Sequence, residues 1–242
     1  MADGNDFFTP GDQRAANVNA LFATIASRYD RINDLQSLGL HRRWKRRMIE
    51  LARLRPGDVA LDVCCGTGDI AMALADRGAR VTGLDFSHEM LEVAKSRNSA
   101  IRGMASVNYL HADAMKLPFS DGSFDVVTVG YGLRNLADWE VGLSEMVRVA
   151  KPGARVLVLD FGKPDNTVWR AIYFAYLRVC VPLFGLLFCR NAAAYAYILE
   201  SLKHFPAQRG VDAKLRSLGL AEVRTHNILG GAMAINSAQK PG

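Results

Sequence analysis

A glycine-containing segment at positions 61–71, LDVCCGTGDIA, decides the fold of this 242-residue chain. The apolar run at 59–63 predicts a buried strand, and the amphipathic segment 68–77 predicts a helix directly after it. Gly66 and Gly68 permit a sharp turn between the two and a close approach of a ligand to the backbone. The segment fits the loose dinucleotide pattern G-x-G-x-x-[G/A], which on its own is weakly specific.

The alternation of strand and helix continues along the chain. Further strands are expected at 80–84, 107–110, 124–129 and 155–159, and helices at 87–98 and 138–150. Near the end, LAEVRTHNI and AMAINSA flank Gly230-Gly231 and predict two strands joined by a turn. Repeated strand–helix–strand units predict an α/β fold with a doubly wound, mostly parallel seven-stranded sheet and an antiparallel last strand.

The composition favours one domain over 1–242, because half of the residues are apolar (50%) and the length suits a single α/β core. Its segments differ in character. We expect a flexible lead at 1–14, N-terminal helices at 16–55, the glycine-loop core at 56–164, a helical, aromatic-rich insertion at 165–205, and a closing helix and strands at 206–242.

The positive charge of the chain comes from one short segment. Lysine and arginine number 30 against 24 acids, which gives a net charge of +6. Five basic residues lie together at Arg42, Arg43, Lys45, Arg46 and Arg47, and without these five the +6 falls to +1. The spacing of Leu40, Trp44, Met48 and Leu51 predicts an apolar face on the same helix. A single local patch argues against a protein that follows nucleic acid with its whole surface.

The cysteines and the apolar segments set the expected compartment. The four cysteines form no C-x-x-C pair or Cys/His cluster, so we expect free thiols, no disulfides and no metal site. The N-terminal segment MADGNDFFTPGDQ has no apolar core of a secretory signal. The run VCVPLFGLLFC, between Arg178 and Arg190, is shorter than the ~20 residues that a spanning helix requires. A cytoplasmic protein is expected.

Acidic residues lie at or just after the ends of three of the predicted strands. Asp85 lies 17 residues after Gly68, where a carboxylate can accept hydrogen bonds from two ribose hydroxyls, and Asp113 suits an exocyclic amine. Each acid alone can instead order a loop, as Ser87 can cap a helix, but the combination favours a bound nucleoside. Asp62 has no use in a pyrophosphate cradle, yet it suits an ammonium and a sulfonium. This favours S-adenosylmethionine over a dinucleotide.

Three longer stretches carry a more specific resemblance. They are YDRIN at 29–33 with Ser37, His41 and Trp44 after it, LPFSDGSFDVVTVGYGLRN at 117–135, and RVAKPGARVLVLDFGKP at 148–164. With these motifs the chain resembles class I S-adenosylmethionine-dependent methyltransferases, and specifically the UbiE/MenG family of quinone C-methyltransferases, from about Ala16 to the C-terminal strands. It departs from that family at Ile32, Gln36, Gly130 and Asp160.

The resemblance implies the reaction and most of the site. The expected reaction is C-methylation of a polyprenyl quinol ring, demethylmenaquinol in menaquinone biosynthesis, with a benzoquinol of ubiquinone biosynthesis as the alternative. The cofactor would be S-adenosylmethionine. Taken with the strand-end acids, the expected cofactor-binding residues are Asp62, Gly66, Thr67, Gly68, Asp85, Phe86, Asp113 and Ala114.

Catalysis is assigned to Arg134 and Asn135, which follow the fourth strand. Arg134 stays protonated, so it would stabilise a phenolate or orient a water that acts as the base. The alternative is that Arg134 pairs with a neighbouring carboxylate and organises the loop. We leave His41, His111 and His204 out of the site because a lone histidine is more often structural.

The insertion at 165–205 is expected to cover the substrate, with Tyr195 and Tyr197 lining the pocket, although its composition equally suits an ordinary helical core. The five basic residues at 42–47 would then hold the protein against the inner face of a membrane, unless their helix simply packs on the domain. The competing functions are an NAD(P)-dependent oxidoreductase, a nucleic-acid methyltransferase and a non-catalytic nucleoside-binding module.

Overall fold

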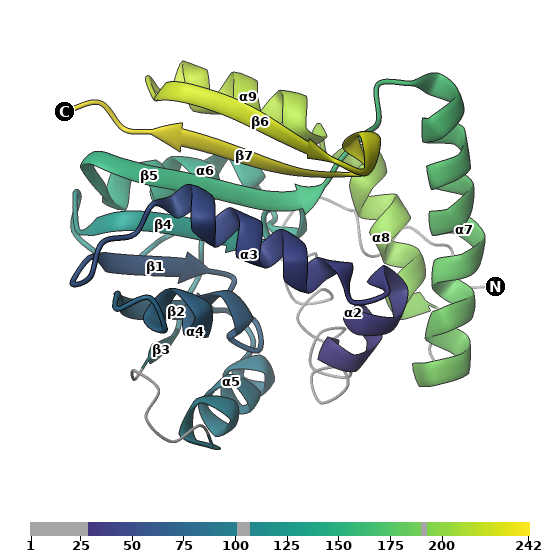
Figure 1. The fold of residues 1–242 in the computed structure, drawn as a ribbon, viewed down its shortest axis with the longest axis horizontal. Coiled ribbons are helices and arrows are strands. Elements are labelled where there is room, and N and C mark those ends of the chain that lie inside the picture. The colour runs from purple at the N-terminus through teal and green to yellow at the C-terminus, as the bar shows by residue number, and fades with distance from the viewer. Residues whose placement is uncertain (1–28, 101–106, 190–192) are drawn as a thin grey trace.

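A computed structural model describes residues 29–100, 107–189 and 193–242. Within these ranges seven strands form one sheet in the order β3-β2-β1-β4-β5-β7-β6 (Figure 1). Strands β1 to β5 run parallel to one another, whereas β7 is antiparallel to both β5 and β6. The doubly wound sheet with an antiparallel last strand is therefore confirmed. The strands are β1 (Val59–Val63), β2 (Arg80–Asp85), β3 (Asn108–His111), β4 (Phe124–Gly130), β5 (Ala150–Phe161), β6 (Ala221–Ile228) and β7 (Met233–Gln239).

Helices cover both faces of the sheet. Helices α3 and α4 pack on one face, and α6, α8 and α9 contribute to the core on the other. The helices are α2 (Tyr29–Ser37), α3 (Leu40–Ala52), α4 (Asp69–Ala75), α5 (His88–Ala100), α6 (Trp139–Val149), α7 (Thr167–Cys189), α8 (Ala193–His204) and α9 (Ala207–Ser217). The central strands are apolar on both sides because both faces are covered: Ala60 packs towards α3 and α4, whereas Leu61 faces the opposite core.

The expected elements agree with the structure except at β5. Residues 151–154, which separate the expected helix from the expected strand, are part of β5, which begins at Ala150 rather than at 155. Gly153 N–H donates to the Lys240 carbonyl, and Lys240 N–H donates to the Ala154 carbonyl. Pairing with a segment about 90 residues away thus extends the strand, a contact that local turn signals do not encode. The expected lead at 1–14 and the first part of the N-terminal helical segment lie outside the described residues.

Helix α3, which carries the basic patch, is attached to the domain by its apolar face. Met48 and Ile49 are buried, Trp44 and Leu51 are partly buried against the same core, and Leu40 is exposed. The alternative given for this segment, a helix packed on the domain with its basic residues in solvent, is therefore the arrangement in the structure. Helix α3 has no continuous apolar face left for a membrane.

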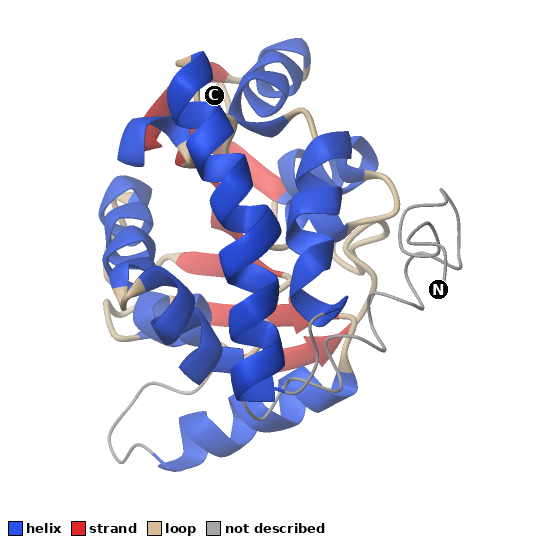
Figure 2. Ribbon diagram, turned by 90° about the vertical axis from the view of Figure 1, so that its right-hand side faces the viewer, coloured by secondary structure: helices blue, strands red, loops and turns tan. Residues whose placement is uncertain are grey.

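The insertion at 165–205 contributes α7 and α8, which lie beyond the carboxyl ends of the parallel strands (Figure 1). Figure 2 shows α7 crossing this edge of the sheet. The segment Thr167–Phe184 of α7 is the one described helix stretch long and apolar enough to span a membrane, and only 17% of it is buried. The eleven-residue run between Arg178 and Arg190 underestimated the length of this apolar segment, because α7 also includes Arg178 and the apolar residues before it. The hydroxyl groups of Tyr173 and Tyr176 donate to the Ala232 and Gln36 carbonyls at 2.9 and 2.8 Å, so α7 is fastened to the domain.

Candidate active site

The glycine loop after β1 is held by the carboxylate at the end of β2. Gly66 N–H donates to Asp85 Oδ2 at 2.7 Å, and Ser87 N–H donates to Asp85 Oδ1 at 2.9 Å. Gly66 and Gly68 both have positive φ, 54° and 85°, which favours glycine. A Cβ at Gly68 would also lie 2.5 Å from the Tyr109 hydroxyl. The two glycines are therefore needed for the shape of the loop.

Asp85 keeps the capacity to bind a ligand. Burial raises its pKa, while the N–H groups of Ser87 and Gly66 oppose that shift. Each carboxylate oxygen accepts one of these bonds and has a second lone pair for a ribose hydroxyl. The side chain thus orders the loop, as the alternative interpretation holds, and can also contact a nucleoside.

The predicted base-binding residues lie beside Asp85, after β2 and β3. The Phe86 ring is 46% exposed and stacks on His111 with 5.7 Å between ring centroids. Asp113 Oδ1 accepts from Met115 N–H at 2.8 Å, and Ala114 is buried. Register pairs Asp85 with His111 across the two strands, so the loops that follow them are neighbours. Phe86 is the member of this group with a face available for a flat ring.

Asp62 lies beneath the glycine loop and is completely buried. Its Oδ1 accepts from the Thr128 hydroxyl at 2.8 Å, whereas Oδ2 has no hydrogen bond of good geometry, and the backbone N–H of Ala71 makes only a weaker contact with the carboxyl group. Burial raises the pKa of Asp62 to about 7, with the Thr128 hydrogen bond opposing the shift. A buried carboxyl group with an unsatisfied oxygen is costly, and a cation close to the loop would relieve that cost.

A network of charged side chains joins the glycine loop to helices α2 and α5. The Thr67 hydroxyl donates to Asp30 Oδ1 at 2.8 Å, and Arg97 Nη1 donates to Asp30 Oδ2 and to the Thr67 carbonyl at 2.8 and 3.0 Å. Arg97 also pairs with Asp69 at 2.6 Å, and Lys45 pairs with Asp69 at 2.7 Å. Burial by itself would raise the pKa of Asp69, but Lys45 and Arg97 hold it at about 2. The network fixes α2 and α3 against the loop.

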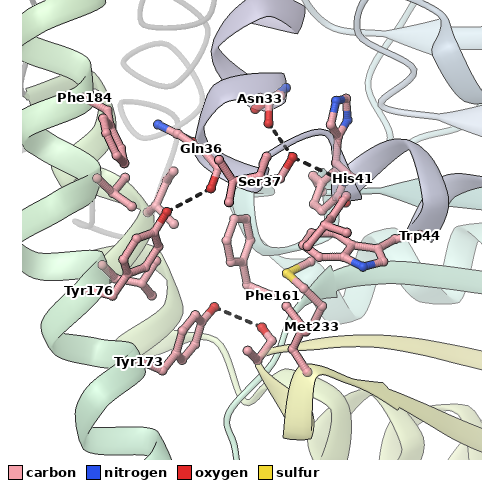
Figure 3. Close-up of a pocket in the computed structure, with 18 of the residues that line it drawn as sticks. Asn33, Gln36, Ser37, His41, Trp44, Phe161, Tyr173, Tyr176, Phe184 and Met233 are labelled. Carbon is pink, nitrogen blue, oxygen red and sulfur yellow. Dashed lines mark hydrogen bonds between the residues drawn. The ribbon is translucent and has the colours of Figure 1, made fainter.

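A cavity of about 480 Å³ lies next to this loop, between α7 and the N-terminal helices (Figure 3). Its wall is mainly apolar and aromatic. The side chains that line it include Trp44, Tyr131, Phe161, Trp169, Tyr173, Tyr176, Leu177 and Met233, together with the polar Asn33, Gln36, Ser37 and His41. Such a cavity suits a flat apolar ring with a hydrocarbon tail better than a polar substrate.

The cavity and the glycine loop share a wall. A Cβ at Gly132, in the loop after β4, would lie 2.3 Å from the Cβ of Cys64, so the two loops touch at backbone level. Next to it, Tyr131 lines the cavity with φ at +63°, a strained value for a tyrosine. The ammonium of Lys45 lies 5.9 Å from the Tyr131 ring centroid and also pairs with Asp69 on α4. A ligand in the cavity and one on the loop would therefore be adjacent.

Arg134 lines the cavity and is engaged on three sides. Its Nη1 lies 2.7 Å from Asp160 Oδ1 and 2.6 Å from the Tyr131 carbonyl, and its Nη2 donates to the Tyr197 hydroxyl at 3.1 Å. Its guanidinium also lies 4.7 Å from the Phe161 ring centroid. The alternative given for Arg134, pairing with a neighbouring carboxylate, is thus confirmed. Asp160 is its partner, a residue that the sequence analysis did not place in the site.

The other predicted residues divide between the wall and its support. Tyr197 is buried and lines the cavity, and burial raises the pKa of its hydroxyl. Asn135 Nδ2 donates to the Tyr131 carbonyl at 3.1 Å, so this side chain supports the loop. The side chain of Tyr195 lies outside the described residues.

Comparison with known proteins identifies the family. The profile of the ubiE/COQ5 methyltransferase family matches residues 10–240. The chain belongs to this family. A demethylmenaquinone methyltransferase of Desulfitobacterium hafniense (strain Y51) is 40% identical over 235 residues, which cover 96% of this chain and 92% of the relative. One from Staphylococcus aureus (strain JH9) is 39% identical over 226 residues, 92% of each chain.

Solved structures agree on the fold. A methyltransferase of Aquifex aeolicus described as SAM dependent has a TM-score of 0.61 at 19% identity, over 87% of this chain and 97% of the other. A putative methyltransferase from Haloferax volcanii, solved with the Trm112 activator, has a TM-score of 0.65 at 19% identity, over 91% and 98%. As a member of the ubiE/COQ5 methyltransferase family, the chain is an enzyme for methyl transfer, which argues against the oxidoreductase and binding-module interpretations.

One departure of this ubiE/COQ5 member lies against the side chain of Ile70. A Cβ at Gly130 would lie 2.3 Å from Ile70 Cδ1, so a larger residue at 130 would require the end of that side chain to move.

The N-terminal contribution to the site was underestimated. His41, left out above, lines the cavity and shares a 2.8 Å contact with Asp34. The stretch from Asp30 to Trp44 supplied part of the resemblance and of the basic helix, but none of its residues was predicted to lie at the site, and only its match to the family motif could have placed it there.

Proposed function

We propose that this enzyme transfers a methyl group from S-adenosylmethionine to a ring carbon of a reduced polyprenyl quinone, with demethylmenaquinol as the acceptor. One observation carries the proposal: Tyr131 and Arg134 line an apolar cavity of about 480 Å³, and Gly132 between them lies against Cys64 of the glycine loop. The names of the two bacterial relatives support the naphthoquinol over the benzoquinol.

The residues present fit the cofactor. Asp85 has free lone pairs for the ribose hydroxyls, and Phe86 offers an exposed ring to the adenine beside Asp113 and Ala114. Beneath the glycine loop, the unsatisfied Asp62 Oδ2 places negative charge where an ammonium group would lower its cost. When bound, S-adenosylmethionine supplies an electrophilic methyl group on its sulfonium.

The chain itself contributes mainly by positioning. A quinol carbon attacks a methyl group well only when the ring is reduced and a hydroxyl loses its proton, and the carbon must lie in line with the S–CH₃ bond. Positioning of this kind can lower a barrier by about 7–11 kcal/mol at best. The aromatic walls at Phe161 and Tyr131 would hold the ring flat at the shared wall.

Arg134 and Asn135 act in this proposal as positioning residues. Both donate to the Tyr131 carbonyl, and Arg134 also holds the Tyr197 hydroxyl. Asp160 balances the charge of Arg134. The phenolate that forms on the quinol ring would therefore face the dipole of an ion pair held in place, and not an unpaired positive charge.

A methyl-transfer assay tests the proposal. Labelled S-adenosylmethionine is offered with demethylmenaquinol and with a polyprenyl benzoquinol, each in reduced and oxidised form. We expect label in the reduced naphthoquinol and little in its oxidised form. Transfer to the benzoquinol alone would exclude the naphthoquinol assignment, and transfer to neither would exclude quinol methylation.

A pocket variant makes the assay specific for the cavity. Ile172 lines the cavity from α7 and is 55% exposed, so Ile172→Trp narrows the entrance at a position that tolerates a large side chain. Val141, 42% exposed on α6 and outside the cavity lining, is the matched control as Val141→Trp. We expect a raised KM for the long-tailed acceptor in the first variant only.

We also propose that the enzyme works in the cytoplasm at the inner face of the membrane, where the five basic residues assist. Their contributions are unequal in the structure. Lys45 is 11% exposed and pairs with Asp69, and Arg42 and Arg47 pair with Asp34 and Glu50. Arg43 and Arg46 are exposed on the same helix. Since α3 uses its apolar face for packing, the apolar part of any membrane contact must come from elsewhere.

A further inference from the structure

Helix α7 carries a second apolar stripe that no other described element of the domain covers. Tyr173, Leu177 and Val181 recur every four residues and are buried on the domain side. On the side facing solvent, Ile172 and Val179 are 55% and 63% exposed. Leu183 and Leu186 continue this stripe at 49% and 53%. A helix of a water-soluble domain normally presents polar residues there, so an uncovered stripe of this length indicates a contact surface.

The stripe continues into the mouth of the cavity. Ile172 belongs to both, because it lines the cavity and is more than half exposed. Leu38, at the end of α2, and Leu229, before β7, also line the cavity and are 85% and 51% exposed. We call these three residues together with Val179, Leu183 and Leu186 the apolar rim.

The charges around the apolar rim are predominantly positive. Helix α7 contains Arg170 and Arg178 and no aspartate or glutamate, and Asp165 just before it pairs with Arg209. Across the cavity mouth, α3 presents the exposed Arg42 and Arg43 in its first turn, where Arg42 pairs with Asp34. An apolar surface with basic neighbours is complementary to anionic headgroups over hydrocarbon.

We propose that the apolar rim docks on the surface of a phospholipid bilayer that contains anionic lipids, with α7 lying in the interface. Its buried stripe and the hydrogen bonds of Tyr173 and Tyr176 keep α7 on the domain, so it lies along the bilayer rather than crossing it. The cavity mouth then opens on the lipid, and an acceptor can bring its ring into the enzyme while its tail stays in the hydrocarbon. The entry of the acceptor from the lipid rests on the proposed quinol methylation, whereas the docking of the apolar rim on the bilayer does not.

Vesicle co-sedimentation tests this surface without any substrate. The full chain is mixed with vesicles of phosphatidylcholine alone or of equal parts phosphatidylcholine and phosphatidylglycerol. We expect binding to the anionic vesicles that weakens in high salt. The double variant Val179→Glu/Leu183→Glu should reduce the bound fraction about tenfold, because two carboxylates enter the contact. Val141→Glu, on α6, is the matched control and should bind as the parent does.

The two substituted positions lie outside the cavity lining, which separates docking from catalysis. Methyl transfer to a short-tailed, water-soluble quinol should be unchanged in the double variant, and a folded, active enzyme that no longer binds vesicles supports the proposal. Equal binding by parent and double variant would overturn it. So would a dimer in sedimentation velocity that the double variant dissociates, since the rim would then contact a second copy. Failure of the quinol assay with intact vesicle binding would count against the proposed function only.

Discussion

Arg134 Nη1 lies 2.7 Å from Asp160 Oδ1, and the two side chains are only 3% and 5% exposed. Asp160 Oδ2 also accepts from the backbone N–H of Arg134 at 3.3 Å. The end of β5 therefore fixes the loop after β4, and through Tyr197 it fixes α8 as well. Three elements of the substrate wall depend on one buried ion pair.

Removing one partner of this pair should be costly. We expect Arg134→Ala to lower the free energy of unfolding by about 3–5 kcal/mol, because it leaves an uncompensated carboxylate in the core. The double variant Arg134→Met/Asp160→Leu should recover most of the loss. Urea unfolding measures both. The exposed pair Arg47–Glu50 is the control, and Arg47→Ala should cost less than about 1 kcal/mol. Equal losses at the two sites would contradict a buried pair.

The pKa of Asp62 predicts an unusual pH dependence of stability. Between about pH 4, where an unfolded aspartate ionises, and pH 7, the folded chain retains a proton that the unfolded chain has lost. The stability of the cofactor-free enzyme should therefore fall as pH rises through this window. Asp62→Asn removes the effect, so it should stabilise the enzyme at pH 8, by up to about 4 kcal/mol, and not at pH 4. Denaturant titrations at the two pH values measure this.

The same variant reports on the cofactor. If Asp62 compensates an ammonium group, Asp62→Asn should weaken S-adenosylmethionine binding while it stabilises the free enzyme. Asp76→Asn, at an exposed position after α4, should change stability by no more than about 0.5 kcal/mol at either pH. A variant that binds the cofactor as tightly as the parent would remove Asp62 from the binding site.

Arg97 should control the affinity of the glycine loop for its ligand. Arg97 holds Asp30, Asp69 and the Thr67 carbonyl together and so keeps the loop ordered. Without Arg97 the loop would have to become ordered when the ligand binds, and this ordering would reduce the free energy of binding. We expect Arg97→Gln to raise the Kd for S-adenosylmethionine about tenfold, or about 1.4 kcal/mol. Calorimetry measures the Kd. Lys95→Gln, on the same helix and paired only with the exposed Glu92 in the structure, should leave it unchanged. If both substitutions raised the Kd equally, the loss of one positive charge would explain the effect, and a specific role of Arg97 in the loop would be contradicted.

The contact between Gly132 and Cys64 predicts a rescue. Gly132→Ala should destabilise the enzyme by about 1–3 kcal/mol and reduce methyl transfer, because the new methyl group overlaps the Cys64 Cβ. Adding Cys64→Gly removes that atom at a position with φ of 54°, where glycine is favoured, and should restore both properties. Cys64→Ser keeps the Cβ and should not rescue. Thermal melts and activity assays of the three variants decide the matter.

The core of the fold was predictable because its signals are local. The strands β1 to β4 are short apolar runs bounded by turn residues, and a parallel sheet brings the acids at or just after their ends, Asp62, Asp85 and Asp113, to one edge. Spacing along the chain was therefore enough to predict that these acids lie at one edge of the sheet.

The substrate side was less predictable because its contacts join distant segments. The partner of Arg134 is 26 residues away, and the partner of Thr67 is 37 residues away. No periodicity distinguishes Asp160 or Asp30 from other acids in their neighbourhoods. In the sequence, the two apolar stripes of α7 form one continuous hydrophobic segment. Only the structure shows that one stripe is buried and the other exposed.

The cavity draws on both Asn33 and Met233, which are 200 positions apart. During synthesis on a ribosome, β1 to β5 and the glycine loop leave the exit tunnel well before β7 does. The glycine loop therefore leaves the ribosome before the cavity can be complete, because one wall of the cavity includes Met233 of β7, between β5 and β6. Completion of the cavity thus depends on the last strand of the chain to be made.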